Sequence, residues 1–375
     1  MPVIAIDYTP AYEQGGGIGR YVRELVAALA QADSQTSYRL FVAGVNSNGL
    51  PSPPAPNFTW NSTALSPRWL ARIWHRARLP IPVEFFTGSV DLYHATDFVL
   101  PPTRSKTRTL LTVHDLSFVR VPEAASPGLK AYLDRVVPAS VSRADHVLAD
   151  SQATKNDLVS LYDTPSHKIS VLLSGVDARF KRTDPSVLLT MRRKYRLERP
   201  FIFSIGTVQP RKNYGRLIQA LALLRRKNYE IDLVIAGGKG WLDDPIYETV
   251  RDTYMQQHVH FIGFADETDL PALYSAAECL AFPSLYEGFG FPVLEAMACG
   301  TPVVTSNVSS LPEVAGNAGL MVDPYDTEAI AQALTNILDD TALRSQLIEK
   351  GYAQVGRFSW VESARKLRQI YGDML

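Results

Sequence analysis

Residues 282–300 read Phe-Pro-Ser-Leu-Tyr-Glu-Gly-Phe-Gly-Phe-Pro-Val-Leu-Glu-Ala-Met-Ala-Cys-Gly, and this stretch predicts the end of a strand, a glycine-rich turn and a short helix. Residues 280–283 end the buried strand. Pro292 suits the first helical position, because proline lacks the amide proton that would stay unpaired there, and Gly300 suits the position just past the helix end. The turn in between should aim its backbone amides outward.

This turn predicts a site for an anion. Gly288 and Gly290 lack a Cβ atom, so a ligand can approach the main chain, and amides that converge on a helix N-terminus attract phosphate. Glu287 should lie beside that anion, and Glu295 one turn into the helix. A plainer interpretation is that the glycines only turn the chain and that the helix dipole stabilises an acidic residue.

Outward from this stretch, short apolar runs alternate with helical segments along all 375 residues, a pattern typical of parallel sheets covered by helices on both faces. We expect strands in the first half at 3–6, 39–43, 92–94, 109–113, 147–149 and 169–172. In the second half we expect them at 201–205, 233–236, 260–262, 280–282, 303–305 and 319–322. The sequence therefore predicts an α/β protein with two Rossmann-like domains.

We place the N-terminal domain at 1–180 and the C-terminal domain at 181–357. Residues 358–375 predict a final helix with Trp360, Ala364, Leu367 and Tyr371 on one face. Between 39 and 68 there is no charged residue and proline, serine and asparagine are dense, so an irregular loop is expected there.

Composition narrows the class of protein. Lys and Arg together number 38, and so do Asp and Glu together, which gives a formal net charge of zero. The chain therefore has no overall positive charge that would attract nucleic acid. Cys279 and Cys299 lie in apolar segments without metal-ligand spacing, which indicates core residues in a reducing compartment. The N-terminus, Met-Pro-Val-Ile-Ala-Ile-Asp, predicts a first strand rather than a signal peptide, and no apolar stretch reaches the ~20 residues that a membrane span needs. We therefore expect a cytoplasmic protein.

Two motifs in the first half are candidate binding elements. A glycine cluster that includes Gly16 and Gly17 opens a helix, but Val22 stands where a dinucleotide fingerprint starting at Gly17 needs a glycine, which disfavours a dehydrogenase. His114 and Asp115 follow the strand predicted at 109–113. Ligands of open parallel sheets bind beyond the carboxyl ends of the strands, so this pair should point into a cleft between the domains.

Two motifs in the second half point to a diphosphate. Gly206 ends a predicted strand and is followed shortly by Arg211 and Lys212 at a helix start, where cations oppose the helix dipole unless an anion joins them. Gly237 opens a second glycine cluster, which lacks the spacing of a P-loop, and Phe264 follows the next strand. From their charge and place, Arg211 and Lys212 should face the diphosphate.

Residues 282–300 with the following 300–305, Gly-Thr-Pro-Val-Val-Thr, resemble the E-x7-E motif of retaining glycosyltransferases of the GT-B fold, particularly glycosyltransferase family 4. The resemblance covers about residues 200–325, extends to 3–21 and 109–177, and is absent for 45–90. It implies two Rossmann-like domains that face each other across a cleft. It also implies a final helix that crosses back to the first domain.

The resemblance implies roles for individual residues. Glu295 would hold the ribose hydroxyls and Glu287 the sugar hydroxyls, while Arg211 and Lys212 neutralise the leaving diphosphate and His114 contacts the transferred sugar. Many members of the family have Gly-Arg where this chain has Gly206-Thr207, so Arg211 would supply the displaced charge. The remaining donor contacts would come from Gly16, Gly17, Gly206, Gly237, Phe264, Gly288, Phe289, Gly290 and Phe291.

We therefore predict a retaining enzyme that moves a hexose, glucose or mannose, from a UDP- or GDP-linked donor to a glycan or lipid-linked acceptor in polysaccharide biosynthesis. Nothing resembles the Asp-x-Asp metal clamp of the other major fold, so no metal or further cofactor is required. Two alternatives stay open: a nucleotide-sugar epimerase or hydrolase of the same fold, and a sugar-binding protein without turnover.

Residues 68–78 stand outside the resemblance. Arg68, Arg72 and Arg76 have helical i, i+4 spacing, and Trp69 and Trp74 lie on other faces. This helix could bury its aromatic side chains as an ordinary surface element. Alternatively, the arginines and tryptophans could cooperate in peripheral contact with an anionic membrane at its inner face.

Overall fold

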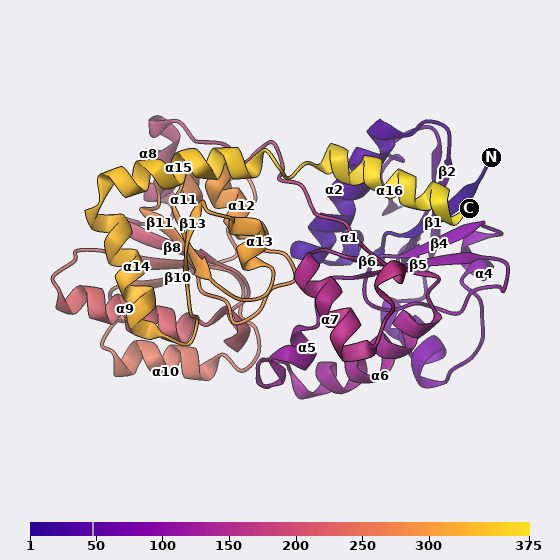
Figure 1. Ribbon diagram of the computed structural model, residues 1–375, viewed down its shortest axis with the longest axis horizontal. Helices are drawn as coiled ribbons and strands as arrows, with labels where there is room; N and C mark the ends of the chain where they lie inside the picture. Colours follow the sequence, from indigo (N-terminus) through magenta and orange to yellow (C-terminus); the bar gives the residue numbers. More distant parts are fainter. Residues whose placement is uncertain (47–48) are drawn as a thin grey trace. The chain divides into compact units, whose positions relative to one another are not determined.

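The computed structural model describes residues 1–46 and 49–375. Contacts within the chain divide it into two compact units (Figure 1). Unit 1 consists of Met1–Leu116, Ala131–Gly175 and Ser359–Leu375, and unit 2 of Ser117–Lys130 and Val176–Phe358. Each unit is an α/β body with its own sheet, so the predicted α/β fold class is confirmed.

Unit 1 is built on a parallel sheet of seven strands in the order β3-β2-β1-β4-β5-β6-β7. The strands are β1 (Val3–Asp7), β2 (Ser37–Ala43), β3 (Phe58–Thr63), β4 (Leu92–Ala95), β5 (Arg108–Val113), β6 (His146–Ala149) and β7 (Ile169–Val171). The central strands are buried on both faces, because helices cover both sides of the sheet (Figure 1).

The sequence analysis missed β3. It predicted an irregular loop from 39 to 68, and that prediction is wrong for Phe58–Thr63, which pairs in parallel with β2 from Tyr38 to Ala43. Phe58 is buried and stacks on Tyr38 with ring centroids 4.5 Å apart, which fixes the strand at the sheet edge. The prolines that suggested a loop all lie before or after the strand, where an edge strand tolerates them.

The helices of unit 1 flank this sheet. They are α1 (Thr9–Glu13), α2 (Gly17–Ala32), α3 (Pro67–Ala71), the π-helix η2 (Arg72–Arg76), α4 (Glu84–Thr87), most of α6 (Pro127–Arg143), α7 (Gln152–Tyr162), the 3₁₀ turn η4 (Ser166–Lys168) and α16 (Trp360–Met374). The C-terminal α16 lies along α2 (Figure 1). The Tyr371 hydroxyl is 2.7 Å from Nδ1 of His94, and the Ser363 hydroxyl donates to the Leu173 carbonyl at 2.6 Å.

Unit 2 is built on a parallel sheet of six strands in the order β10-β9-β8-β11-β12-β13. The strands are β8 (Phe201–Ile205), β9 (Asp232–Ala236), β10 (Val259–Gly263), β11 (Cys279–Phe282), β12 (Val303–Ser306) and β13 (Gly319–Val322). Each predicted strand of both units is therefore present, to within two residues at either end. The hydrophobic core of unit 2 includes Leu217, Leu233 and Leu334.

The helices of unit 2 again lie on both faces of the sheet. They are α5 (Ser117–Arg120), η3 (Pro122–Ala124), α8 (Pro185–Lys194), η5 (Pro210–Lys212), α9 (Tyr214–Arg226), α10 (Asp244–Asp252), α11 (Leu270–Ala276), α12 (Phe291–Ala298), α13 (Leu311–Ala315), α14 (Thr327–Asp339) and α15 (Thr341–Val355). Among the described residues, none of the helices in either unit combines the length and the apolar character that a bilayer crossing needs.

Candidate active site

The glycine-rich turn of unit 2 connects β11 to α12. Gly290 has φ 121° at the N-cap of α12, and Gly300 has φ 68° just beyond its end, and L side chains rarely adopt either conformation. Pro292 is the second residue of the helix, one position later than predicted. The sequence therefore shapes the two ends of α12 through glycines at positions that need them.

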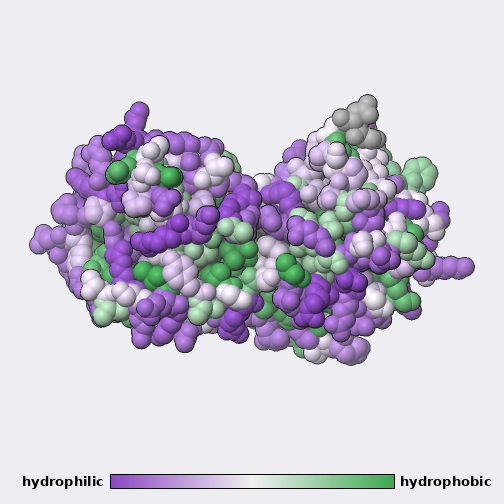
Figure 2. All heavy atoms as spheres, turned by 90° about the horizontal axis from the view of Figure 1, so that it is seen from above, coloured by the Kyte–Doolittle hydropathy of each residue, from purple (hydrophilic) through white to green (hydrophobic). Residues whose placement is uncertain are grey.

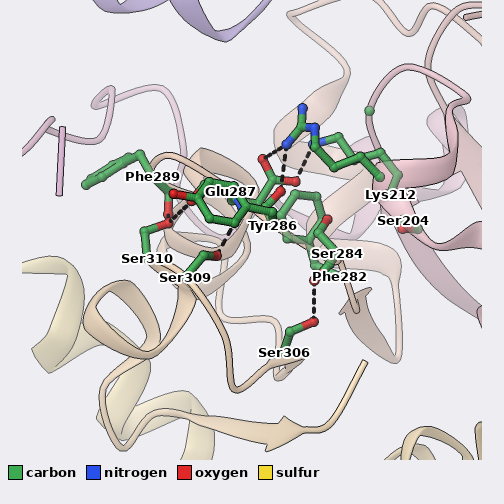
Figure 3. A network of polar contacts seen from close by, with 12 residues as sticks. Ser204, Lys212, Phe282, Ser284, Tyr286, Glu287, Phe289, Ser306, Ser309 and Ser310 are labelled. Atoms are coloured by element: carbon green, nitrogen blue, oxygen red, sulfur yellow. Dashed lines mark hydrogen bonds and ion pairs between the residues drawn. The ribbon is translucent and has the colours of Figure 1, made fainter. Parts of the chain in front are cut away.

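Glu287 lies in this turn and pairs with both predicted cations (Figure 3). Its Oε2 atom is 2.8 Å from Nη1 of Arg211, and its Oε1 atom is 2.7 Å from Nζ of Lys212. The cations come from η5, which follows β8, so two neighbouring strands of the sheet deliver the three side chains. Their charges sum to +1, so the cluster keeps positive charge toward an anion.

The backbone around Glu287 is held by a second set of hydrogen bonds (Figure 3). The Glu287 amide donates to the Ser309 hydroxyl at 3.0 Å, and the Ser310 hydroxyl is 2.9 Å from the Glu287 carbonyl oxygen and 2.6 Å from that of Phe289. Arg211 also donates to the Tyr286 carbonyl at 2.7 Å. The carboxylate is thus fixed before any ligand arrives, which is the preorganisation that electrostatic catalysis needs.

Burial and charge act in opposite directions on Glu287. Burial alone would raise the pKa of its carboxyl group, but the charges of Arg211 and Lys212 and the hydrogen bond from Lys212 outweigh burial and lower the pKa to about 2. Glu287 is therefore ionised throughout the physiological range. It cannot act as a general acid there.

Gly206 leaves room for the Lys212 side chain, and Gly237 leaves room for the backbone of Gly206. A Cβ atom on Gly206 would lie 2.8 Å from Cε of Lys212, and one on Gly237 would lie 2.0 Å from the carbonyl oxygen of Gly206. Both glycines have positive φ, 141° and 145°. The lysine stem can therefore run along bare backbone, and its Nζ atom lies 4.7 Å from the centroid of the Phe282 ring.

Glu295 lies on α12 and is 3% exposed. Its Oε2 atom accepts a hydrogen bond of 2.7 Å from the Tyr274 hydroxyl of α11. Tyr274 is buried and packs edge-on against Phe203, with ring centroids 5.2 Å apart. The assignment of Glu295 to the ribose hydroxyls stays a prediction.

The other predicted donor residues of unit 2 differ in exposure. Gly288 is buried, and Phe289 is buried and packs against Phe291 and Phe358 at centroid distances of 5.1 and 5.8 Å, so that its contact with the donor stays a prediction. Phe264 is 86% exposed. Its ring lies against Gly238, where an added Cβ atom would be only 2.4 Å from the ring carbons. Of these residues, Phe264 therefore presents the most accessible ring to a ligand.

In unit 1, His114 follows β5 as predicted but is buried, and both of its ring nitrogens contact protein. Nδ1 is 2.7 Å from Oδ2 of Asp150, and Nε2 is 2.8 Å from the Thr96 carbonyl oxygen. Burial opposes a charged imidazole, but the charge and hydrogen bond of Asp150 together with the charge of Asp97 raise the pKa of His114 to about 9. That His114 contacts the sugar stays a prediction.

Sequence reasoning missed Asp150, Thr96 and Asp97, although each directly follows a strand. Asp150 comes after β6, and Thr96 and Asp97 come after β4, at the sheet edge that His114 occupies after β5. Asp97 accepts a hydrogen bond from Gln14 at 3.0 Å. The signal was available, because polar residues just past strand ends gather at one edge of a parallel sheet.

Gly16 and Gly17 lie at the start of α2 and are exposed, and a Cβ atom on Gly16 would meet nothing within 4 Å. The nearby Gly19 is different, because a Cβ atom there would lie 1.9 Å from the carbonyl oxygen of Gln14. Close backbone packing therefore requires Gly19, whereas Gly16 has open space around it at the helix start. Their contact with the donor stays a prediction.

Comparison with known proteins identifies the family. The model of the group 1 glycosyl transferases matches residues 190–354, and that of glycosyltransferase family 4 matches residues 15–180. O-antigen chain mannosyltransferase B of Escherichia coli is 32% identical over 358 residues, which cover 92% of this chain and 92% of that protein.

Solved structures share the fold over the whole chain. Sucrose-phosphate synthase from Thermosynechococcus elongatus aligns with a TM-score of 0.77 at 23% identity, over 100% of this chain and 99% of that one. HepE of Anabaena, in complex with UDP and glucose, aligns with a TM-score of 0.74 at 19% identity over 99% of each chain. The chain therefore belongs to the group 1 glycosyl transferases of glycosyltransferase family 4, and its two parallel α/β sheets are those of the GT-B fold.

Proposed function

We propose that this glycosyltransferase moves a hexose from a nucleoside diphosphate sugar to a glycan or lipid-linked acceptor in polysaccharide biosynthesis, with retention of the anomeric configuration. The observation that carries the proposal is the buried cluster of Arg211, Lys212 and Glu287 beside a glycine-rich turn. A site of this kind suits a ligand that gains negative charge as it leaves.

The cations would stabilise the bond-breaking step. When the bond between the sugar and the diphosphate breaks, negative charge grows on the phosphate oxygen, and a cation ~4 Å away stabilises it by up to ~4 kcal/mol at an effective dielectric constant of ~20, before desolvation. Lys212 and Arg211 are held in place by Glu287, so little reorganisation is needed during the reaction. A phosphate oxygen of the leaving group could accept the proton of the acceptor hydroxyl.

Glu287 would act first as the residue that positions these cations. Its two carboxylate oxygens are engaged by one cation each, at 2.8 and 2.7 Å. A sugar hydroxyl could still donate to the same oxygens, since each carboxylate oxygen has two lone pairs. Contact between Glu287 and the sugar hydroxyls is therefore compatible with the positioning role.

Two relatives guide the choice of donor sugar. A mannosyltransferase of O-antigen chains is 32% identical to this chain, which favours mannose and a polysaccharide product. HepE was solved with UDP and glucose, and it shares the fold at 19% identity. We therefore propose mannose or glucose as the hexose, with GDP or UDP as the carrier.

A donor panel tests this proposal. Thermal midpoints should be measured with GDP-mannose, UDP-glucose and an ADP-sugar, and one donor at ~100 times its dissociation constant should add ~2.7 kcal/mol of stability. Release of nucleoside diphosphate should then be followed with and without a glycan acceptor. Release that depends on acceptor is expected; acceptor-independent release would favour a hydrolase or epimerase, and binding without release a sugar-binding protein.

A further inference from the structure

Residues 65–85 of unit 1, here called the 65–85 surface, expose large hydrophobic side chains close together in the sequence. This stretch includes α3, η2 and the start of α4. Its exposed hydrophobic residues are Leu65 (41%), Trp69 (55%), Leu79 (47%), Ile81 (37%) and Phe85 (76%). Five exposed large hydrophobic side chains within 21 residues of sequence are more than the single exposed ones that need no explanation.

The same stretch exposes four positive charges. Arg68, Arg72, Arg76 and Arg78 are all exposed, and the Arg72 guanidinium lies 4.7 Å from the centroid of the Trp69 ring. Glu84 is the sole acidic residue between 65 and 85 in the sequence. It is 3% exposed, and its carboxylate accepts hydrogen bonds from Thr107 and the Arg104 amide. The exposed charges contributed by the 65–85 surface are therefore all positive.

Side chains that point inward fix this surface to the sheet. Leu70 is 3% exposed, the Trp74 ring packs edge-on against Phe86 at a centroid distance of 6.1 Å, and Phe86 packs against Phe41 of β2 at 5.8 Å. The Trp74 indole donates to the Ile81 carbonyl at 2.8 Å, which ties the helical part to the loop after it. Trp74 is thus partly buried, whereas Trp69 faces solvent.

The helix itself is irregular. It was predicted as one helical run, but α3 ends at Ala71 and a π-helix spans Arg72–Arg76, closed by a bond from the Ala77 amide to the Arg72 carbonyl at 2.8 Å. Arg78 then adopts φ 53° and ends the run. A π-helical turn is rare and is often found at functional sites, and here it changes the helical register between Arg72 and Arg76.

We propose that the 65–85 surface docks onto a lipid bilayer with anionic headgroups. Trp69 and Phe85 would enter the interface between headgroups and acyl chains, where aromatic side chains gather. The four arginines would contact lipid phosphates, and their aliphatic stems would lie on the interface. Figure 2 shows one face of the molecule, on which hydrophobic groups reach the surface between hydrophilic ones. The inference stands on exposure and charge and does not depend on the proposed reaction.

Vesicle co-sedimentation tests this docking. Wild-type protein is mixed with vesicles of equal parts phosphatidylglycerol and phosphatidylcholine, or of phosphatidylcholine alone. We expect binding to the anionic vesicles, little to the neutral ones, and a marked loss when salt is raised to about 0.5 M. Replacing Arg68, Arg72, Arg76 and Arg78 together by Gln should weaken binding to anionic vesicles at least about tenfold.

Two further variants make the test specific. A double variant, Trp69→Ser with Phe85→Ser, keeps every charge and should weaken binding about tenfold through lost apolar contact. A control removes four exposed cations elsewhere, by Gln substitution of Arg193, Arg226, Lys227 and Lys366, and should bind as wild type does. Thermal unfolding should be the same for all variants, since the replaced side chains are exposed.

Three outcomes would overturn the proposal. The first is wild-type binding that is equally weak on anionic and neutral vesicles. The second is a loss in the control as large as that in the four-arginine variant, which would indicate attraction by overall charge. The third is a wild-type dimer that dissociates in the Trp69→Ser, Phe85→Ser variant, which would assign the 65–85 surface to contact between two copies of the chain.

Discussion

Among single residues, Glu287 matters most to the site, because its carboxylate holds both Arg211 and Lys212. Sequence could predict Arg211, Lys212 and Glu287 as members of one site, because a glycine-rich turn and a helix start follow neighbouring strands. It could not predict that both cations bond to the same carboxylate at 2.8 and 2.7 Å. The stem of Lys212 packs against Gly206, which in turn packs against Gly237, and no local pattern reveals this packing.

Glu287→Gln should reduce the stability of the fold. It removes the buried anion between two partly buried cations, so the loss should be at most the roughly 3–5 kcal/mol that breaking a fully buried ion pair costs. Urea unfolding should register this loss, and inorganic pyrophosphate should restore part of it by binding Arg211 and Lys212. The matched control, Glu230→Gln, removes an exposed partner of Arg225 and should change stability little. Equal stability of Glu287→Gln and wild type would mean that the ion pairs contribute nothing.

The raised pKa of His114 implies that the folded protein loses stability at alkaline pH. The folded protein raises the pKa of His114 from 6.5 to about 9, so the contribution of the charged imidazole is complete below pH 6.5 and is lost as the pH rises through 9. The free energy of unfolding should fall by at most about 3 kcal/mol over this window. Urea unfolding at several pH values measures it.

Two variants control this pH profile. His114→Gln should abolish the fall between pH 6.5 and 9, whereas His167→Gln, which replaces an exposed histidine, should retain it. A fall that persists unchanged in His114→Gln would assign the profile to another group.

At the scale of elements, parallel strands and the glycines that follow them determine where the functional groups lie. Gly206 follows β8 and Gly237 follows β9, and the backbones of these two glycines are in close contact. Helix α12 places Glu295 beside Tyr274 of α11. The sequence predicted these strands and helices from apolar periodicity. It missed β3, because a short edge strand with one buried residue, Phe58, gives a weak pattern.

Gly237→Ala should unfold or severely destabilise the protein. Its φ of 145° disfavours any side chain, and the new Cβ atom would lie 2.0 Å from the Gly206 carbonyl oxygen. We expect a cost of more than about 2 kcal/mol, from strain and from the shift of Gly206. Gly215→Ala is the control. Gly215 lies in α9, and its new Cβ atom would be 3.6 Å from the Thr249 hydroxyl oxygen, an ordinary contact, so stability should stay within about 1 kcal/mol. Equal stability of the two variants, measured in urea, would show that the backbone contact is not required.

Glu295→Ala should weaken binding of the nucleoside diphosphate. If its carboxylate accepts from the ribose hydroxyls, its removal costs about 1.5–3 kcal/mol, which is roughly 10- to 150-fold in affinity. Calorimetry with GDP and UDP measures the change. Tyr274→Phe, which removes the hydroxyl that donates to Glu295 but keeps the ring, serves as the comparison and should bind more tightly than Glu295→Ala. Unchanged affinity in Glu295→Ala would return this residue to a structural role.

At the scale of the whole molecule, the alternation of strands and helices was enough to predict the α/β class and both sheets. It did not predict that Ser117–Lys130 packs with unit 2, where Trp241 donates to the Ala124 carbonyl at 2.9 Å. Ala124 and Val121 form a small apolar cluster with Tyr286, the neighbour of Glu287. Such packing joins segments far apart in the sequence, so local periodicity carries no sign of it.

If cations held by Glu287 stabilise the leaving diphosphate, Lys212→Met should transfer sugar much more slowly than wild type. Acceptor-dependent release of nucleoside diphosphate should be measured at saturating donor, alongside the thermal midpoint. We expect a rate at least about 100-fold below wild type with the fold retained, because a preorganised charge acts mainly in the transition state. A wild-type rate from folded Lys212→Met protein would contradict it.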